Sequence, residues 1–236
     1  MVSPGSTDGS REIIERYRDR IARVIFEPDH GPADGLNKGF ALATGEIYGF
    51  LNADDLLLPG ALATVRQYFE ANTHVDVGSG HSIIIDQDDK KLRICYSARF
   101  SLVRCAYGAV VLMQPSTFFR RSTFISTGGF NPDNRSNWDG ELFVDMALAE
   151  ARFALISAFL AAYRVHGGSI TDSSRIEALI RLHGEKMFWK ITGREMRRRD
   201  LLLAQAWRVV KHLREPRNFY QRVICGPIYG IARTRT

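Results

Sequence analysis

Two adjacent carboxylates, Asp54 and Asp55, follow a short apolar run, residues 47–51, and are the strongest chemical signal in the sequence. Two like charges about 4 Å apart repel each other by on the order of 4 kcal/mol at an effective dielectric of 20. A divalent cation relieves that repulsion, and Mg²⁺ or Mn²⁺ is commonly held by one or two carboxylates together with substrate phosphates. The pair therefore predicts a metal site that docks a diphosphate. The alternative is a polar turn that caps a helix opened by Pro59.

The elements that must position this pair alternate between helix and strand. Residues 47–51 form a nearly continuous apolar run, which predicts a strand covered on both faces, as in a largely parallel sheet. In chain order the patterns predict a helix from Ser10, a strand 22–26, a helix from Pro32 that stops before Gly45, the strand 47–51, a helix from Pro59, strand pieces 75–77, 82–85 and 92–96, a strand 117–119, a helix 139–151 and strands within 153–165. Such alternation implies an open α/β sheet, in which ligands gather beyond the carboxyl ends of strands. Asp54 and Asp55 fall at such an end.

The remainder of the chain predicts one hairpin and a helical extension. Residues 86–89 supply a polar turn between two strand pieces, which is typical of a hairpin. The core is expected to end near Gly168, and beyond it we expect helices at about 173–192 and 195–214. A less regular tail containing Pro216 and Pro227 follows.

Composition places the chain among globular proteins with one sizeable domain. It has 236 residues, of which 45% are hydrophobic, so it can form a real core. The three cysteines occupy no metal-binding spacing, and their odd number argues against a disulfide framework, so a reducing compartment is expected. The first residues contain no apolar signal segment, and no run of about 18 apolar residues predicts a membrane span. We therefore expect a cytoplasmic protein.

The order and spacing of several motifs resemble the family 2 glycosyltransferases. The stretch that carries this resemblance best runs from Gly39 through Asn52-Ala53-Asp54-Asp55 to Leu62. Further matching pieces are Gly5-Ser6-Thr7-Asp8-Gly9, Gln114-Pro115-Ser116, Phe118-Phe119-Arg120-Arg121, Gly128-Gly129-Phe130, Trp138-Asp139-Gly140-Glu141-Leu142 and Ala162-Tyr163-Arg164-Val165-His166. The resemblance covers residues 2 to about 172. It implies a GT-A fold, which is a Rossmann-like open mixed sheet flanked by helices, with residues 173–236 as a basic helical extension.

This resemblance implies a metal-dependent, inverting transfer of a sugar from a nucleotide-diphosphate sugar to an acceptor hydroxyl. Asn52-Ala53-Asp54-Asp55 corresponds to the family's DxD-type motif, so Asp54 and Asp55 are expected to bind Mn²⁺ or Mg²⁺ and the donor, with Asn52 at the first position. Asp139 corresponds to the acid that removes the acceptor proton, a role that typically contributes about 10² to 10⁴-fold. From the residues alone, Asp139 is as readily an N-cap of the following helix.

The resemblance also assigns residues around the donor. Arg164 and His166 are expected to face the donor phosphates or the metal, because Arg offers a bidentate fork and His is a common metal ligand. On composition alone, a histidine at a strand end is more often structural. Asp34, Asn37 and Lys38 are expected to contact the nucleotide, although Lys38 also fits a solvated helix face. Gln114 and the pair Phe118-Phe119 are expected on the acceptor side, where the phenylalanines equally suit the core.

The start of the chain departs from the family pattern. Members usually have a strand, a helix and a second strand before the Gly-Ser-Thr-Asp-Gly turn, whereas this chain begins almost at that turn. Ser3-Pro4 also stands where the family commonly has a base-binding aspartate. We therefore expect an N-terminally truncated domain over residues 1–172. A catalytically silent remnant that retains a nucleotide-sugar or partner-binding surface is the competing hypothesis.

The C-terminal segment concentrates the net charge of +6. Its basic residues are Arg194, Arg197, Arg198, Arg199, Arg208, Lys211, Arg214, Arg217, Arg222 and Arg233. They flank apolar positions at helical spacing, Leu201, Leu202, Ala204, Trp207, Val210 and Leu213. This pattern fits an amphipathic helix at the inner face of a membrane, near a saccharide or lipid-linked acceptor; the alternative is a helix packed on the domain with a solvated basic face. The segment lacks a nucleic-acid recognition motif, so no nucleic-acid partner is expected.

Overall fold

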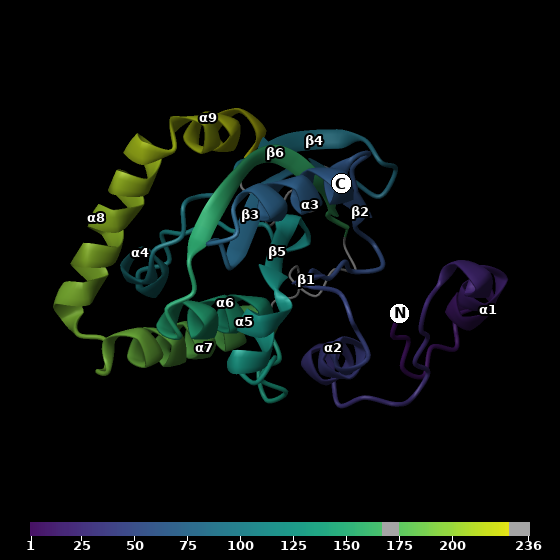
Figure 1. Cartoon of the computed structure of the whole chain (residues 1–236). Helices are drawn as coiled ribbons and strands as arrows, with labels where there is room; N and C mark the ends of the chain where they lie inside the picture. Colours follow the sequence, from purple (N-terminus) through teal and green to yellow (C-terminus); the bar gives the residue numbers. More distant parts are fainter. Residues whose placement is uncertain (167–174, 227–236) are drawn as a thin grey trace.

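A computed structural model describes residues 1–166 and 175–226, of which residues 175–181 are described by their backbone alone. Its strands form one mixed sheet (Figure 1). The strands are β1 (Ile47–Tyr48), β2 (Leu56–Leu57), β3 (Val77–Ile85), β4 (Lys91–Cys95), β5 (Thr117–Arg120) and β6 (Phe153–Arg164). Their order across the sheet is β1-β5-β3-β6-β2, and β4 pairs separately with β3. The open mixed sheet predicted from the sequence is thus confirmed.

Strand β3 organises the sheet because three other strands pair with it. It runs parallel to β6 along its length, from Val77 opposite Phe153 to Ile85 opposite Arg164. Its first half pairs antiparallel with β5 and its second half antiparallel with β4. The β3–β4 pairing is the predicted hairpin. Because β3 and β6 end together, the hairpin turn and Arg164 come to the same edge of the sheet.

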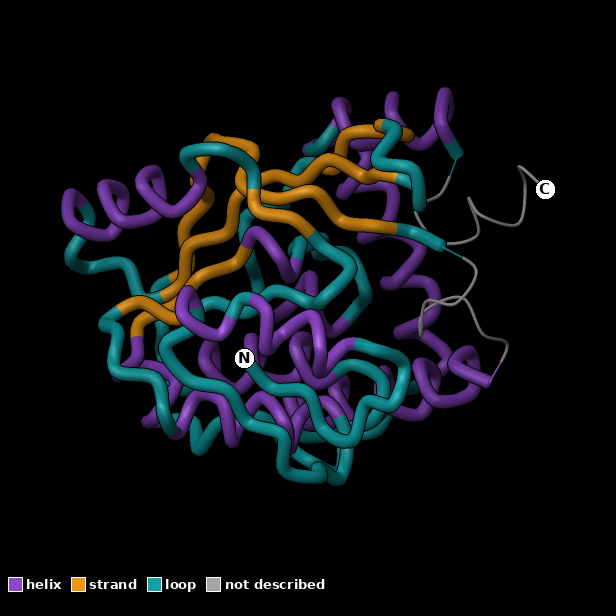
Figure 2. Tube along the Cα trace, turned by 90° about the vertical axis from the view of Figure 1, so that its right-hand side faces the viewer, coloured by secondary structure: helices purple, strands orange, loops and turns teal. Residues whose placement is uncertain are grey.

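Helices cover both faces of this sheet. The helices are α1 (Ser10–Arg16), α2 (Pro32–Ala41), α3 (Ala61–Ala71), α4 (Leu102–Ala106), α5 (Arg121–Ser126), α6 (Trp138–Leu148), α7 (Arg175–Thr192), α8 (Arg198–Arg214) and α9 (Pro216–Cys225). Short 3₁₀ turns occupy Arg18–Arg20 and Gln114–Ser116. Figure 2 shows the strands gathered above the larger group of helices.

The pair Phe118-Phe119 divides the core between the two faces. Because successive side chains of a strand point to opposite faces, Phe119 packs with α2 and α6, whereas Phe118 packs with α3. Phe119 is fully buried and lies 5.8 Å, between ring centroids, from Phe124. The phenylalanines are therefore core residues, as their residue type indicated.

Strand β1 corrects the prediction of a strand buried on both faces. It is only Ile47–Tyr48, it pairs antiparallel with β5, and it lies at the end of the sheet. Only Tyr48 in the apolar run is buried, and Leu51 is 41% exposed. The prediction of a central strand over 47–51 is wrong because an edge strand that faces helices gives the same apolar pattern as a central parallel strand.

The N-terminal region also differs from expectation. Residues 22–26, predicted as a strand, contribute only a single parallel bridge between Ile25 and Val2. Helix α1 begins at Ser10 as predicted, and lies apart from the sheet at the right of Figure 1. The turn before it ends in Gly9, whose φ of 88° suits glycine.

The C-terminal part is more helical than predicted. Helix α7 packs against α4 and α6, with Met187 and Phe188 buried. Lys190 of α7 pairs with Asp145 of α6 at 2.5 Å. Helix α9 replaces the predicted irregular tail because Pro216 stands at its first turn, where a missing N–H costs nothing. The expected core end at Gly168, the boundary 172/173 and Pro227 lie outside the described residues.

Candidate functional site

The acidic pair lies in a tight turn between β1 and β2. The amide of Asp55 donates to the carbonyl of Asn52 at 3.2 Å, which closes the turn. This geometry turns the two carboxylates to different surroundings: Asp55 is 4% exposed, whereas the Asp54 side chain is 39% exposed. One carboxylate is thus held inside the protein while its neighbour faces solvent.

Asp55 is a buried carboxylate with two donors. The backbone amide of Arg164 donates to its Oδ1 at 2.9 Å, and the Asn52 side-chain amide donates to its Oδ2 at 3.3 Å. Burial raises the pKa of Asp55 to about 6, with the adjacent Asp54 charge acting in the same direction and the Arg164 amide opposing it. An ionised Asp55 therefore gains from any cation brought to this turn.

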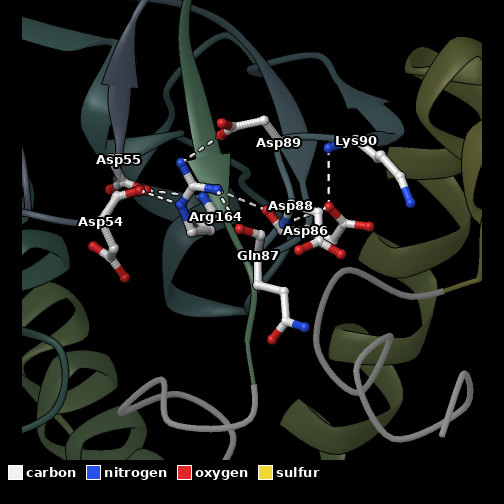
Figure 3. A network of polar contacts seen from close by, with 8 residues as sticks. All are labelled: Asp54, Asp55, Asp86, Gln87, Asp88, Asp89, Lys90 and Arg164. Atoms are coloured by element: carbon white, nitrogen blue, oxygen red, sulfur yellow. Dashed lines mark hydrogen bonds and ion pairs between the residues drawn. The ribbon is translucent and has the colours of Figure 1, made fainter.

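Arg164 fastens the acidic turn to the β3–β4 hairpin (Figure 3). Its Nε donates to the Asp54 carbonyl at 2.7 Å, and its Nη1 donates to the Asp86 carbonyl at 2.8 Å. Its Nη2 pairs with Asp89 at 2.7 Å. The guanidinium, predicted to face donor phosphates, is here engaged with protein oxygens on two loops. Its observed contacts position the acidic turn.

The hairpin turn is a part of this site that the sequence did not reveal. The sequence predicts only a hairpin turn at residues 86–89, yet these residues supply oxygen atoms that accept hydrogen bonds from Arg164. Asp86 also folds the turn itself, because its Oδ1 accepts from the amides of Asp88 and Lys90, each at 2.9 Å. The parallel pairing of β3 with β6 carries both elements to one edge, and no local sequence pattern indicates that pairing.

Asp54 and His166 form a hydrogen-bonded pair beside the acidic turn. His166 Nε2 lies 3.2 Å from Asp54 Oδ2, and both side chains are partly exposed. Neighbouring ligands of an octahedral ion bound at 2.0–2.1 Å lie about 3 Å apart, so this spacing fits Mg²⁺ or Mn²⁺. In residues 1–166 and 175–226 no group of three or more His, Cys, Asp and Glu side chains converges as a metal site. A cation held here needs further ligands, such as substrate phosphates.

Gln114 is hydrogen-bonded to Phe50 and Asn52 of the acidic turn. Its Nε2 donates to the Phe50 carbonyl at 2.6 Å, and its Oε1 accepts from the Asn52 amide at 3.3 Å. Asn52 therefore bridges Gln114 and Asp55, which accounts for an amide at this position. The structure places Gln114 at the acidic turn.

Asp139 lies in the first turn of α6. The helix is N-capped by Asn137, so Asp139 is not the N-cap considered from the sequence. Its neighbour Trp138 packs on the core cluster that also contacts Phe50, two residues before Asn52. Loss of hydration raises the pKa of Asp139, although the amides of its own turn oppose the shift. A carboxylate with a raised pKa is a better proton acceptor.

The three predicted nucleotide contacts on α2 have partners within the protein. Asn37 binds both backbone groups of Phe130: its Nδ2 donates to the carbonyl at 2.8 Å and its Oδ1 accepts from the amide at 2.9 Å. Lys38 Nζ lies 3.2 Å from Asp34 and donates to the Pro28 carbonyl at 2.7 Å. Asn37 thus joins α2 to the Gly128-Gly129-Phe130 turn, and Asp34 and Lys38 stay partly exposed beside it.

A cavity of about 810 Å³ lies beside β1, between the strand and α3. Its lining includes Ile47, Phe50, Leu62, Val65 and Phe118. None of the predicted catalytic, donor or metal residues lines it. The cavity adjoins the acidic turn through Phe50 and Leu51, which also line it.

Comparisons with known proteins identify the family of the chain. A sequence model described as glycosyl transferase family 2 matches residues 1–130, more than half of the chain. A PGL/p-HBAD biosynthesis glycosyltransferase of Mycobacterium tuberculosis is 28% identical over 190 residues, which cover 76% of this chain and 71% of that protein. An uncharacterized glycosyltransferase of a Nostoc species is 40% identical over 96 residues, covering 39% of this chain and 29% of that protein.

Solved structures share the fold. The TM-score is 0.59 at 16% identity to S. aureus TarS 1-349 in complex with UDP-GlcNAc, with 100% of this chain and 66% of that chain covered. It is 0.57 at 19% identity to the mannosyltransferase PcManGT of Pyrobaculum calidifontis in complex with GDP-Man and Mn²⁺, with 95% and 63% covered. These likenesses support a GT-A type sheet flanked by helices. The chain spans between 29% and 71% of the length of these relatives and neighbours.

Proposed function

Because the chain belongs to glycosyl transferase family 2, we propose that it transfers a sugar from a nucleotide-diphosphate sugar to an acceptor hydroxyl. The observation that carries this proposal is the acidic turn, where a buried Asp55 and an open Asp54 stand beside His166. The structural neighbours bound to UDP-GlcNAc and to GDP-Man support the donor class.

In the proposed reaction Asp139 accepts the proton of the acceptor hydroxyl. The oxygen then attacks the anomeric carbon, the bond from that carbon to the diphosphate breaks, and the configuration inverts. The raised pKa of Asp139 suits this role, because a base is most effective when its pKa approaches the working pH. Asn52, Gln114 and Arg164 hold the acidic turn in place during the transfer.

Asp54 and His166 would hold Mn²⁺ or Mg²⁺, and the buried Asp55 carboxylate would add negative charge to that site. The chemistry that a divalent cation supplies when bound is stabilisation of the negative charge on the departing diphosphate. Asp55 supports that site by adding negative charge at a fixed position, since both its oxygens accept hydrogen bonds. The Mn²⁺ in a structural neighbour agrees with this choice of metal.

We assign the partly exposed Asp34 and Lys38 to the nucleotide, with Asn37 fixing the helix that carries them. Arg164 is assigned to the donor side through its hold on the acidic turn. For the acceptor we propose a saccharide or lipid-linked saccharide in polysaccharide or glycoconjugate synthesis at the inner face of a membrane. The mycobacterial relative's name, which places it in PGL/p-HBAD biosynthesis, supports an acceptor of that class.

Calorimetric titration of the full chain with UDP and GDP, with and without Mn²⁺, tests the donor site. We expect Mn²⁺-dependent binding that Asp55→Asn weakens by about 10- to 100-fold, a range typical of residues that support a metal site. Asn at 55 can still accept from the Arg164 amide through its one oxygen, so the change removes the charge together with the acceptor of the Asn52 hydrogen bond.

Asp88→Asn is the matched control, because it removes a carboxylate from the neighbouring hairpin turn and should leave binding unchanged. Equal effects of both variants, or binding that ignores Mn²⁺, would contradict the assignment. Donor binding without any sugar transfer would instead support the catalytically silent alternative.

A further inference from the structure

Helix α8 presents an apolar stripe to solvent. Leu202, Ala206, Val209 and Leu213 follow one another at intervals of four, three and four residues, so they share one face of the helix. Leu202 and Leu213 are each 75% exposed and Val209 is 58% exposed. An amphipathic surface helix ordinarily turns its apolar residues toward the core. On α8 the apolar residues Ala204, Trp207 and Val210 are partly buried, whereas this stripe is exposed.

Polar contacts on the opposite face fix this orientation. Asp200 is fully buried, and it accepts from both terminal nitrogens of Arg194 at 2.7 and 2.8 Å and from the Tyr107 hydroxyl at 3.1 Å. These contacts hold the pKa of Asp200 well below its usual range, with Arg194 as the main cause. At the other end Glu215 pairs with Arg104. These contacts at both ends of α8 hold its inner face against the domain, and the apolar stripe on the opposite face therefore faces solvent.

Helix α9 repeats the arrangement. Its inner face binds the edge strand β4: Asn218 exchanges hydrogen bonds with both backbone groups of Tyr96, at 2.9 and 2.6 Å, and Gln221 accepts from the Ile94 amide at 3.0 Å. Its outer face carries Tyr220, Val223 and Ile224, which are 62%, 67% and 60% exposed. Figure 1 shows α8 and α9 as consecutive helices along one side of the molecule.

The charge around these outer faces has one sign. Both acidic residues of α8 and of the α8–α9 junction, Asp200 and Glu215, are neutralised by arginines on the inner side. Exposed arginines border the apolar stripes, and within residues 1–166 and 175–226 none of them has an ion pair within 4 Å. They are Arg198, Arg199, Arg208 and Arg214 on α8. On α9, the Arg217 guanidinium lies 5.7 Å from the centre of the Tyr96 ring.

We propose that the outer faces of α8 and α9 dock on an anionic membrane surface, with the apolar stripe at the level of the acyl chains and the arginines among the headgroups. Apolar side chains bordered by cations match the layered chemistry of that surface, because arginine stems lie along apolar material while their charges reach the headgroups. A second copy of this chain fits less well, since its arginines would meet the same arginines. No helix among the described residues is long and apolar enough to cross the bilayer.

This inference does not depend on sugar transfer. The docking face involves neither the acidic turn nor Asp139, so binding can be measured without donor, acceptor or metal. A failure of the donor titration would leave the membrane measurement intact, and the reverse also holds.

Vesicle flotation of the full chain tests the proposal. Vesicles of phosphatidylcholine are compared with vesicles containing about one third phosphatidylglycerol, at salt from about 0.1 M to about 0.5 M. We expect binding only to the anionic vesicles, and its loss at the higher salt concentration. Arg208→Gln and Arg214→Gln should each weaken it by roughly fivefold, the effect of one basic residue at a charged surface.

Removing the stripe is the second arm of the test. Leu202→Ser, Val209→Ser and Leu213→Ser together should weaken vesicle binding by about tenfold or more, because each loses apolar area that the membrane would bury.

The matched control substitutes three exposed apolar residues elsewhere, Leu62→Ser, Val103→Ser and Ile125→Ser, which are 62%, 52% and 61% exposed. This control should bind as the unmodified chain does. Equal loss in both triple variants, no binding to anionic vesicles, or a dimer in light scattering that only the stripe variant disrupts would each overturn the proposal.

Discussion

The acidic turn and the α8–α9 surface depart from the ordinary distribution of residues in opposite ways. At the acidic turn a carboxylate, Asp55, is 4% exposed, whereas on α8 two leucines are 75% exposed. Carboxylates are rarely buried without partners, and exposed apolar residues normally stand singly. Each region is therefore costly by itself, and each is held in place by an arginine network.

The comparison separates two uses of arginine. Arg164 reaches outward from β6 to hold two acidic loops, and so keeps negative charge concentrated at one place. Arg194 neutralises Asp200 of α8 and Arg104 neutralises Glu215 at the α8–α9 junction, and so the outer face of α8 remains cationic. One region thus concentrates negative charge, whereas the other presents positive charge beside apolar side chains.

Asp139→Asn gives the largest expected effect on the acidic side. It should lower kcat by about 10² to 10⁴-fold while sparing donor affinity, because only the proton acceptor is removed. At saturating donor and metal, the rate of the unmodified chain should fall as the pH drops through the raised pKa of Asp139, above the ordinary carboxyl range, since the protonated acid accepts no proton. Release of the nucleoside diphosphate during transfer, measured across pH and donor concentration, gives kcat, its pH dependence and the KM for the donor.

The control for Asp139→Asn is Asp133→Asn, which removes an exposed carboxylate shortly before α6. It should retain full activity. The same pH dependence of the rate in the unmodified chain and in Asp139→Asn would rule out Asp139 as the base.

Substitution of one buried and one exposed leucine tests whether the stripe on α8 contributes to the stability of the fold. Leu160 is fully buried, so Leu160→Ala should lower the free energy of unfolding by about 2–5 kcal/mol. Leu202→Ala on the outer face of α8 should change it by less than about 0.5 kcal/mol. Urea unfolding followed by circular dichroism measures both. A comparable loss at Leu202 would mean that the stripe stabilises the fold, and its exposure would then need another explanation.

Much of the fold was predictable because it depends on local patterns. The helices starting at Ser10 and Pro32 and the β3–β4 hairpin follow from turn residues and periodicity, which act over a few positions. The edge position of β1 and the loss of the strand at 22–26 depend on which strands pair, and the local pattern contains no such information. Helix α9 differs from the predicted irregular tail, because a proline such as Pro216 can also stand in the first turn of a helix.

The candidate site was predictable in its residue types and less so in their partners. The motif singled out Asp54, Asp55, Arg164 and His166, and the structure brings these four together. The sequence could not indicate that Arg164 would be held by the hairpin turn, because that contact spans about 75 residues and depends on strand register. Asp34, Asn37, Lys38 and Asp139 remain predictions as donor and catalytic residues.

The smallest expected effect concerns the link between Arg164 and the hairpin turn. Asp89→Asn removes an ion pair whose carboxylate is 68% exposed, and such pairs are worth at most about 1 kcal/mol. Arg164 keeps its bonds to the carbonyls of Asp54 and Asp86, so the acidic turn should stay in place. Mn²⁺-dependent binding of UDP or GDP should weaken by up to about fivefold, because a less constrained Arg164 positions Asp55 less firmly.

Asp88→Asn provides the comparison for this variant, since it removes an equal charge from the same turn without breaking a contact to Arg164. Calorimetry on the two variants separates positioning from general electrostatics: a positioning role predicts weaker binding for Asp89→Asn alone. If both variants weaken binding equally, the hairpin turn acts through its total charge. A loss well above tenfold for Asp89→Asn would instead place its carboxylate among the groups that contact the cation or the donor, and the acidic site would then extend from the β1–β2 turn across to the hairpin.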